Sequence, residues 1–112
     1  MINDIVDNSI LELRRGVVVM AALTILRKEG YGYSVLRQLA ENGLEVDQGT
    51  LYPLLRRLES QGLLQSAWRI EAGRPRRYYQ TSSAGQEILQ KLNEEWKQIT
   101  RAVENITLFK PE

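Results

Sequence analysis

Cysteine and histidine are both absent from the chain. Without cysteine there is no disulfide framework and no thiolate ligand for a metal ion. Without histidine there is no imidazole general base, and no Ser–His or Cys–His pair of the kind that hydrolases use. The carboxylates are scattered through the sequence and suggest no convergent site: Glu12, Glu41, Glu45, Glu59 and Glu95. We therefore predict that the protein is not an enzyme and needs no metal or cofactor.

Excess charge and long hydrophobic runs are also lacking. The formal net charge is +1, so an argument for a nucleic-acid partner must come from local clusters of charge. The most apolar run, residues 16–26, is shorter than the ~20 residues needed to cross a bilayer. Its position and polar flanks do not suit a signal peptide. We expect a cytoplasmic protein that does not enter a membrane.

The length of 112 residues and the hydrophobic content of 43% suit one small domain with a packed core. Glycine and proline separate the predicted elements, which are three helices, a hairpin and a long last helix: about 9–28, 33–42, 48–61 or 50–61, 63–71 with 77–81, and 83–108. This order predicts a mainly α (α+β) fold, with a winged helix-turn-helix DNA-binding domain over 1–82. Residues 83–112 would form a C-terminal dimerisation helix within the same compact unit, capped by Ser82 or Ser83.

The start of the third helix has two solutions. Asp47 is a good N-cap, but a helix that begins at Gln48 places Pro53 past the first turn, where proline costs a hydrogen bond. With Thr50 as the cap, Pro53 falls within the first turn, where it is tolerated.

The predicted hairpin turns at residues 73–75, Gly-Arg-Pro. The alternation of its first strand assigns Trp68 to the core. Tyr78 and Tyr79 point to opposite faces of the second strand. One of the two is expected in the core, and the other either reaches a phosphate or is an ordinary half-buried tyrosine.

The third helix has an apolar stripe and an opposite polar face. The stripe follows helical spacing and predicts the side that docks on the core: Leu51, Leu54, Leu55 and Leu58. The other side offers a close backbone approach, hydroxyl groups near the free amides of the helix start, and two guanidinium groups for guanine or phosphate. Its candidate DNA contacts are Gly49, Thr50, Tyr52, Pro53, Arg56 and Arg57. Taken alone, this could equally be the solvated face of an amphipathic helix.

A basic turn follows shortly after that helix. Arg74, Arg76 and Arg77 fall within four residues and suit a phosphate ridge or a narrow minor groove. A turn that merely discourages edge-to-edge aggregation is the alternative. From residue 56 to residue 77 there are six arginines against two glutamates, and this concentration of charge favours nucleic acid.

The last helix carries apolar residues at alternating spacings of three and four: Leu89, Leu92, Trp96, Ile99, Val103 and Ile106. This heptad stripe predicts a dimer interface with the same helix of a second copy. Packing against the first helix of the same chain is the alternative, and the first helix of one subunit could also cover the last helix of the other. Two Trp96 rings facing across a two-fold axis could hold a flat aromatic ligand, although a large core residue is the commoner role.

The chain resembles the PadR family of transcriptional regulators, short subfamily. The resemblance rests on matching motifs over about 16–92: Gly32-Tyr33, the third-helix segment 49–59 (GTLYPLLRRLE), Gly62-Leu63, Trp68, the segment 73–79 (GRPRRYY), Ser82 and Gly85. It implies a dimeric repressor whose third helix reads the major groove while the wing touches the DNA backbone, and it adds Tyr33 to the candidate DNA contacts. The segment around Trp96 is similar to multidrug-binding members, in which the matching tryptophan stacks on planar drugs at the dimer interface.

We therefore expect a homodimer that binds double-stranded DNA at a palindromic operator, with a planar hydrophobic effector at Trp96 that releases it. The rival from another class is a dimeric protein-interaction module that docks an acidic partner on the same basic face. RNA is a further alternative, but a basic helix and wing suit duplex DNA better.

Overall fold

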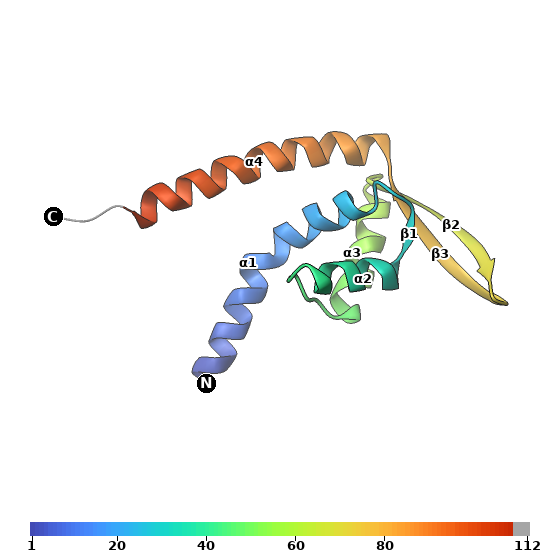
Figure 1. The fold of residues 1–112 in the computed structure, drawn as a ribbon, viewed down its shortest axis with the longest axis horizontal. Helices are drawn as coiled ribbons and strands as arrows, with labels where there is room; N and C mark the ends of the chain where they lie inside the picture. The colour runs from blue at the N-terminus through green and yellow to red at the C-terminus, as the bar shows by residue number, and fades with distance from the viewer. Residues whose placement is uncertain (109–112) are drawn as a thin grey trace.

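The computed structural model describes residues 1–108, which fold into four helices and a three-stranded sheet (Figure 1). The elements are, in chain order, α1 Ile2–Ile25, β1 Gly30–Tyr31, α2 Gly32–Glu41, α3 Gln48–Ser60, β2 Leu64–Glu71, β3 Arg74–Thr81 and α4 Ser83–Thr107. This mainly α architecture with a hairpin is the predicted one. Residues 109–112, which the expected dimerisation segment 83–112 includes, lie outside the described part. Within residues 1–108, no helix is long and apolar enough to cross a membrane.

The start of α3 is set by Asp47. Its Oδ1 accepts a hydrogen bond from the Thr50 amide at 2.7 Å, which satisfies one of the free N–H groups of the first turn. The helix therefore begins at Gln48, and the alternative start capped by Thr50 is wrong. Pro53 lies inside the helix and leaves the Gly49 carbonyl without its usual partner, at a position where both residues are exposed to water.

The hairpin turns more tightly than the sequence indicates. Glu71 pairs with Arg74, so that only Ala72 and Gly73 form the turn, with φ of 51° and 75°. Positive φ at both central residues matches the twist of the two strands. The predicted turn at 73–75 and the predicted strand start at residue 77 are therefore wrong, because the ladder continues to the end of the hairpin.

A third strand completes the sheet. β1 pairs antiparallel with β3, with Gly30 opposite Tyr79 and Tyr31 opposite Tyr78, and the strand order is β1-β3-β2. Two residues are too few to show side-chain alternation, so the sequence predicts only the two strands of the hairpin.

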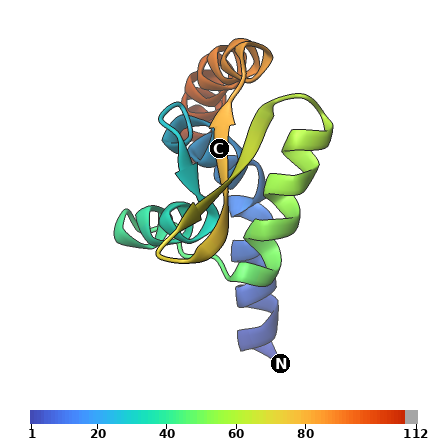
Figure 2. The ribbon, with the colours of Figure 1, turned by 90° about the vertical axis from the view of Figure 1, so that its right-hand side faces the viewer.

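The core lies where α1, α2, α3 and the first part of α4 meet the base of the hairpin (Figure 2). It consists of apolar side chains and one tyrosine: Val18, Ala22, Leu23, Leu26, Val35, Leu39, Leu51, Leu55, Leu58, Leu64, Tyr79 and Leu89. The predicted stripe of α3 is thus confirmed, with Leu54 half-buried at its edge. Of the two tyrosines of β3, Tyr79 belongs to this core, as predicted for one of them. Tyr78 is also buried, but it packs against Tyr31 and Arg69 outside the core cluster.

Trp68 is not part of the core. Its side chain is 66% exposed, and Ile70 on the same strand is 79% exposed. Strand alternation predicts burial only where a helix covers the sheet, and the outer half of the β2–β3 hairpin projects beyond the helices (Figure 1). We call this hairpin the wing.

The two long helices diverge from the core (Figure 1). The helix α1 begins earlier than predicted, at Ile2 with Met1 as its N-cap. Its first half is exposed to water although the segment carries large apolar side chains: Met1, Ile2, Ile5, Val6, Ile10, Leu11 and Leu13. On α4, Leu89 is buried in the chain's own core and Leu92 packs against it. The apolar stripe that continues beyond Leu92 is exposed in this chain.

The first turn of α4 fits closely against the start of the hairpin. Ser82 caps the helix by accepting from the Gly85 amide at 3.0 Å, and its hydroxyl donates to the Gly62 carbonyl at 2.6 Å. A Cβ atom on Gly85 would lie 2.1 Å from the carbonyl oxygen of Leu63, so only glycine fits here.

Candidate nucleic-acid interface

The exposed side of α3 is polar and positively charged. Gly49, Pro53 and Arg56 lie exposed along it, because the helical repeat turns them away from the buried leucines. Arg57 and Thr50 are exposed at one border of this side. The structure thus brings most of the candidate contacts of this helix to one surface.

Tyr52 lies at the other border of α3 and joins it to α2. Its ring is half-buried against the first turn of α2, where a Cβ on Gly32 would lie 2.7 Å from its Cε1. Tyr33, one residue further along α2, is 48% exposed and stacks on Tyr31 with the ring centroids 6.4 Å apart. Gly32 therefore sets the contact between the two helices of the helix-turn-helix.

One face of the wing is a ladder of arginine and tyrosine side chains. The Arg76 guanidinium lies 4.7 Å from the ring centroid of Tyr31, and that of Arg69 lies 5.1 Å from the ring centroid of Tyr78. The two rings meet edge to face with centroids 5.7 Å apart. Arg69 also donates to Glu29 at 2.8 Å. The ladder holds the wing against β1 through cation–π contacts.

The other face of the wing is held to α3 by Arg77. Its guanidinium forms an ion pair with Glu59 and donates from Nε to the Ser66 hydroxyl at 3.2 Å. It also lies 5.5 Å from the ring centroid of Tyr79 and 5.8 Å from that of Trp68. Sequence reasoning grouped Arg77 with the other arginines of the turn. In the structure Arg76 and Arg77 lie on opposite faces of β3, and of these two only Arg77 pairs with a carboxylate of α3.

The arginines differ in whether their charge is already paired. Among residues 1–108, Arg56, Arg57 and Arg74 have no carboxylate within ion-pair distance. Arg76 has only Glu71, with the nearest nitrogen and oxygen 4.0 Å apart. Three of these guanidinium groups thus lack a carboxylate partner, and the fourth, that of Arg76, is paired only at the limit of ion-pair distance.

Both tyrosines of β3 have a raised pKa. The hydrogen-bonding carboxylate of Glu71 is the main cause that raises the pKa of Tyr78, with burial second. Burial is the main cause that raises the pKa of Tyr79. Both hydroxyl groups therefore remain protonated at neutral pH and can act as hydrogen-bond donors.

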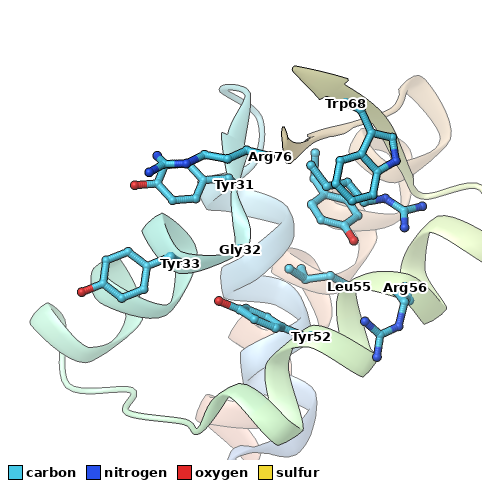
Figure 3. A pocket seen from close by; sticks show the side chains of 10 residues that line it. Tyr31, Gly32, Tyr33, Tyr52, Leu55, Arg56, Trp68 and Arg76 are labelled. Atoms are coloured by element: carbon cyan, nitrogen blue, oxygen red, sulfur yellow. The ribbon is translucent and has the colours of Figure 1, made fainter. Parts of the chain in front are cut away.

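A hollow of about 500 Å³ lies between the helix-turn-helix and the wing (Figure 3). Tyr33, Tyr52 and Arg56 line it from the helices, and the wing contributes Trp68, Arg76 and the paired Arg77. Residues from distant parts of the chain thus border one concave surface that combines aromatic walls with guanidinium groups. Trp68 and Tyr31 were not among the predicted contacts: the strand position of Trp68 suggested burial, and Tyr31 carried no pattern of its own.

A second hollow, of about 370 Å³, lies on the other side of α3. Thr50, Pro53 and Arg57 border it from α3, and Arg14 and Arg15 border it from α1. The predicted α3 contacts therefore divide between two neighbouring hollows. The two α1 arginines had no sequence signal of their own, because only the fold brings α1 alongside α3.

Trp96 borders a third and smaller hollow of about 270 Å³. Its walls are Gly16 and Met20 from α1, and Leu92 and Ile99 from α4. In the single chain Trp96 is 44% exposed. Because the stripe beyond it is exposed as well, packing of the whole stripe on the chain's own α1 is wrong.

The comparisons with known proteins agree on one class. The family model described as "Transcriptional regulator PadR-like family" matches residues 22–95. The chain is similar to transcriptional regulator Rv3488 of Mycobacterium tuberculosis, with 39% identity over 67% of this chain and 70% of that protein. It is also similar to a crystal structure of a PadR family transcriptional regulator from Eggerthella lenta, with 42% identity, a TM-score of 0.89 and 96% of each chain covered. A PadR-like transcriptional regulator from Bacillus cereus gives 27% identity and a TM-score of 0.78, over 88% of this chain and 99% of that one.

Proposed function

The chain belongs to the PadR-like family of transcriptional regulators, and we propose that it is a repressor that binds a palindromic DNA operator as a homodimer. In this proposal α3 enters the major groove and the wing follows the adjacent backbone or minor groove. The proposed DNA contacts from the helices are Tyr33, Gly49, Thr50, Tyr52, Pro53, Arg56 and Arg57. Those from the wing are Arg74 and Arg76.

One observation is the main support for placing the DNA-binding surface between α3 and the wing. Arg56 from α3 and Arg76 from the wing border the same hollow, and Arg56 has no carboxylate partner among the described residues. Phosphate contacts by such groups release counterions and dominate the affinity for duplex DNA. A concave basic surface between a helix and a hairpin matches a phosphate ridge that runs between two grooves.

The test of this face is the salt dependence of binding. Arg56→Ala with Arg76→Ala removes two phosphate contacts from each subunit and therefore four from the dimer. The negative slope of log K against log salt should become shallower by about 3.6, at ~0.9 for each contact. Arg101→Ala is the matched control, because Arg101 is an exposed arginine on α4 and lies away from the face. Unchanged affinity and slope in the double variant would exclude the proposed face. If the chain binds an acidic protein and shows no preference between a palindromic and a scrambled duplex, the result would favour the rival hypothesis of a protein-interaction module.

The dimer is supported by apolar surface that this chain leaves uncovered. Trp96, Ile99, Val103 and Ile106 are between 44% and 72% exposed along one stripe of α4. Neighbouring exposed apolar residues on the first half of α1 would extend the interface, so that α1 of one subunit could cover α4 of the other. Leu89 stays in the chain's own core, and Leu92 at its edge can take part in both contacts.

Val103→Glu tests the dimer because it places a charge in the middle of the stripe. We expect a monomer in sedimentation equilibrium at concentrations where the unaltered chain is a dimer. Gln98→Glu is the control, since Gln98 lies on the same helix outside the stripe. A dimer that persists in Val103→Glu would place the interface elsewhere.

We further propose that a planar aromatic effector binds beside Trp96 and lowers operator affinity. The hollow at Trp96 has apolar walls from both α1 and α4, and Glu95 at its border favours a cation. An occupant of this hollow would change the separation of the two helices and thereby the distance between the two α3 helices of a dimer.

The effector is tested by fluorescence in a Trp68→Phe background, where Trp96 is the remaining tryptophan. A flat aromatic cation such as ethidium should quench Trp96 in a saturable way, and Trp96→Ala should abolish the binding measured by calorimetry. Lack of quenching, together with intact binding in Trp96→Ala, would remove this part of the proposal.

A further inference from the structure

Glu59 and Arg77 form the only ion pair between α3 and the wing within residues 1–108. The side chains are partly buried, with 26% of Glu59 and 34% of Arg77 exposed. Ser66 on β2 donates to the Glu59 carboxylate and accepts from Arg77, so that one carboxylate, one hydroxyl and one guanidinium form a closed network. The network links the last turn of α3 to both strands of the hairpin.

We propose that this network, the wing clasp, sets the angle of the wing relative to α3, and that Arg77 is a positioning residue and not a DNA contact. The inference rests on the proposed function, since the angle matters when helix and wing meet the same duplex. It also explains why Arg77 differs from its neighbours, whose guanidinium groups remain available.

The hydrogen-bond inventory of Arg77 supports the positioning role. Its Nη2 is taken by Glu59 and its Nε by Ser66, while Trp68 and Tyr79 lie within cation–π distance. A guanidinium that is already neutralised by a carboxylate adds little attraction for a phosphate.

The position of the clasp gives it control over the wing. The outer half of the hairpin is not covered by the core, as the exposure of Trp68 and Ile70 shows. Ser66 and Arg77 lie where the covered part of the ladder gives way to the uncovered part. A contact at this point restrains the base of the outer segment and therefore the direction in which it projects.

Neutralising Glu59 distinguishes a direct phosphate contact by Arg77 from a positioning role, because the two predict opposite changes in DNA affinity. If Arg77 bound phosphate directly, Glu59→Gln would remove a nearby negative charge and tighten binding to DNA. The clasp predicts that Glu59→Gln weakens duplex binding by about fivefold to tenfold, a size typical of coupling within one hydrogen-bonded network. Glu71→Gln is the matched control, because Glu71 is a wing carboxylate outside the clasp, and it should not weaken binding.

Two further measurements keep the test decisive. The charge exchange Glu59→Arg with Arg77→Glu should recover part of the lost affinity, which a direct phosphate contact at position 77 excludes. In a Trp96→Phe background and without DNA, the fluorescence anisotropy of Trp68 should fall in Glu59→Gln and rise again in the exchanged pair, because Trp68 lies against Arg77.

Unchanged anisotropy, or tighter binding in Glu59→Gln, would overturn the clasp. If the unaltered chain bound no duplex at all, the proposed function would fail, and the anisotropy would still decide whether the clasp holds the wing.

Discussion

Gly85 offers a severe test of how α4 is attached to the domain. In Gly85→Ala the new Cβ would lie 2.1 Å from the Leu63 carbonyl oxygen and 2.7 Å from Cγ2 of Thr81. An ordinary carbon–oxygen contact is about 3.3 Å, so the two backbones must separate by roughly 1 Å. That shift stretches the two hydrogen bonds of the Ser82 hydroxyl, at 3.0 Å to the Gly85 amide and 2.6 Å to the Gly62 carbonyl.

The magnitude follows from three contributions. The clash of the new methyl group with the backbone of Leu63, which can move only slightly, lowers the free energy of unfolding by about 3 kcal/mol. Weakening of the Ser82 cap adds about 1 kcal/mol, and the better helix propensity of alanine returns about 1 kcal/mol. The net loss of about 3 kcal/mol should lower Tm by about 12 to 15 °C, at roughly 4 to 5 °C per kcal/mol for a chain of this length.

Thermal unfolding followed by circular dichroism, at one fixed protomer concentration, measures this effect. Gly16→Ala is the control, because a Cβ on Gly16 meets no atom within 4 Å and the residue lies inside α1. It should raise stability by up to about 1 kcal/mol. A Gly85→Ala chain that melts within 2 to 3 °C of the unaltered chain would show that α4 is not seated on Leu63 as described.

Three other outcomes follow from the structure. Asp47→Ala should cost about 1 kcal/mol in chemical unfolding, because it removes the side-chain cap of α3, whereas Asp47→Asn should cost little. Gly32→Ala should weaken duplex binding with a smaller change in Tm, since the new Cβ displaces the movable ring of Tyr52; equal affinity would show that this ring does not set the DNA face. Burial raises the pKa of Tyr79, so the folded state holds the phenol proton more tightly; this contribution is complete below about pH 10 and is lost as the pH rises through the folded pKa. Melts from pH 8 to 11.5 should show that decline, and Tyr79→Phe should reduce it.

Much of this architecture could be predicted because its local signals agree with one another. The leucine stripe of α3, the glycine after α2 and the serine before α4 each follow from helical periodicity and capping chemistry. Gly43 follows α2 with φ of 89°, and Ser82 caps α4. The exposed side of α3 could be predicted for the same reason, since periodicity that assigns the buried side also assigns its opposite.

The features that the sequence analysis missed depend on contacts between distant segments. β1 is held by backbone pairing with β3 and has too few residues for a pattern. The strand alternation around Trp68 predicts burial, but the side chain is exposed because no helix covers the part of the sheet where it lies. In the sequence, Arg77 is one of three arginines of the same turn, beside Arg74 and Arg76. Its ion pair with Glu59 distinguishes it, and that pair forms only because the fold brings α3 next to the wing.

The most direct test of the central claim is a titration of one duplex by the purified chain. An operator selected in vitro should be palindromic, bind two protomers per duplex, and bind at least ~10³-fold more tightly than a scrambled duplex at the same salt concentration. Equal affinity for the selected and the scrambled duplex, or saturation by a single protomer, would contradict the account of a dimer that reads DNA through α3 and the wing.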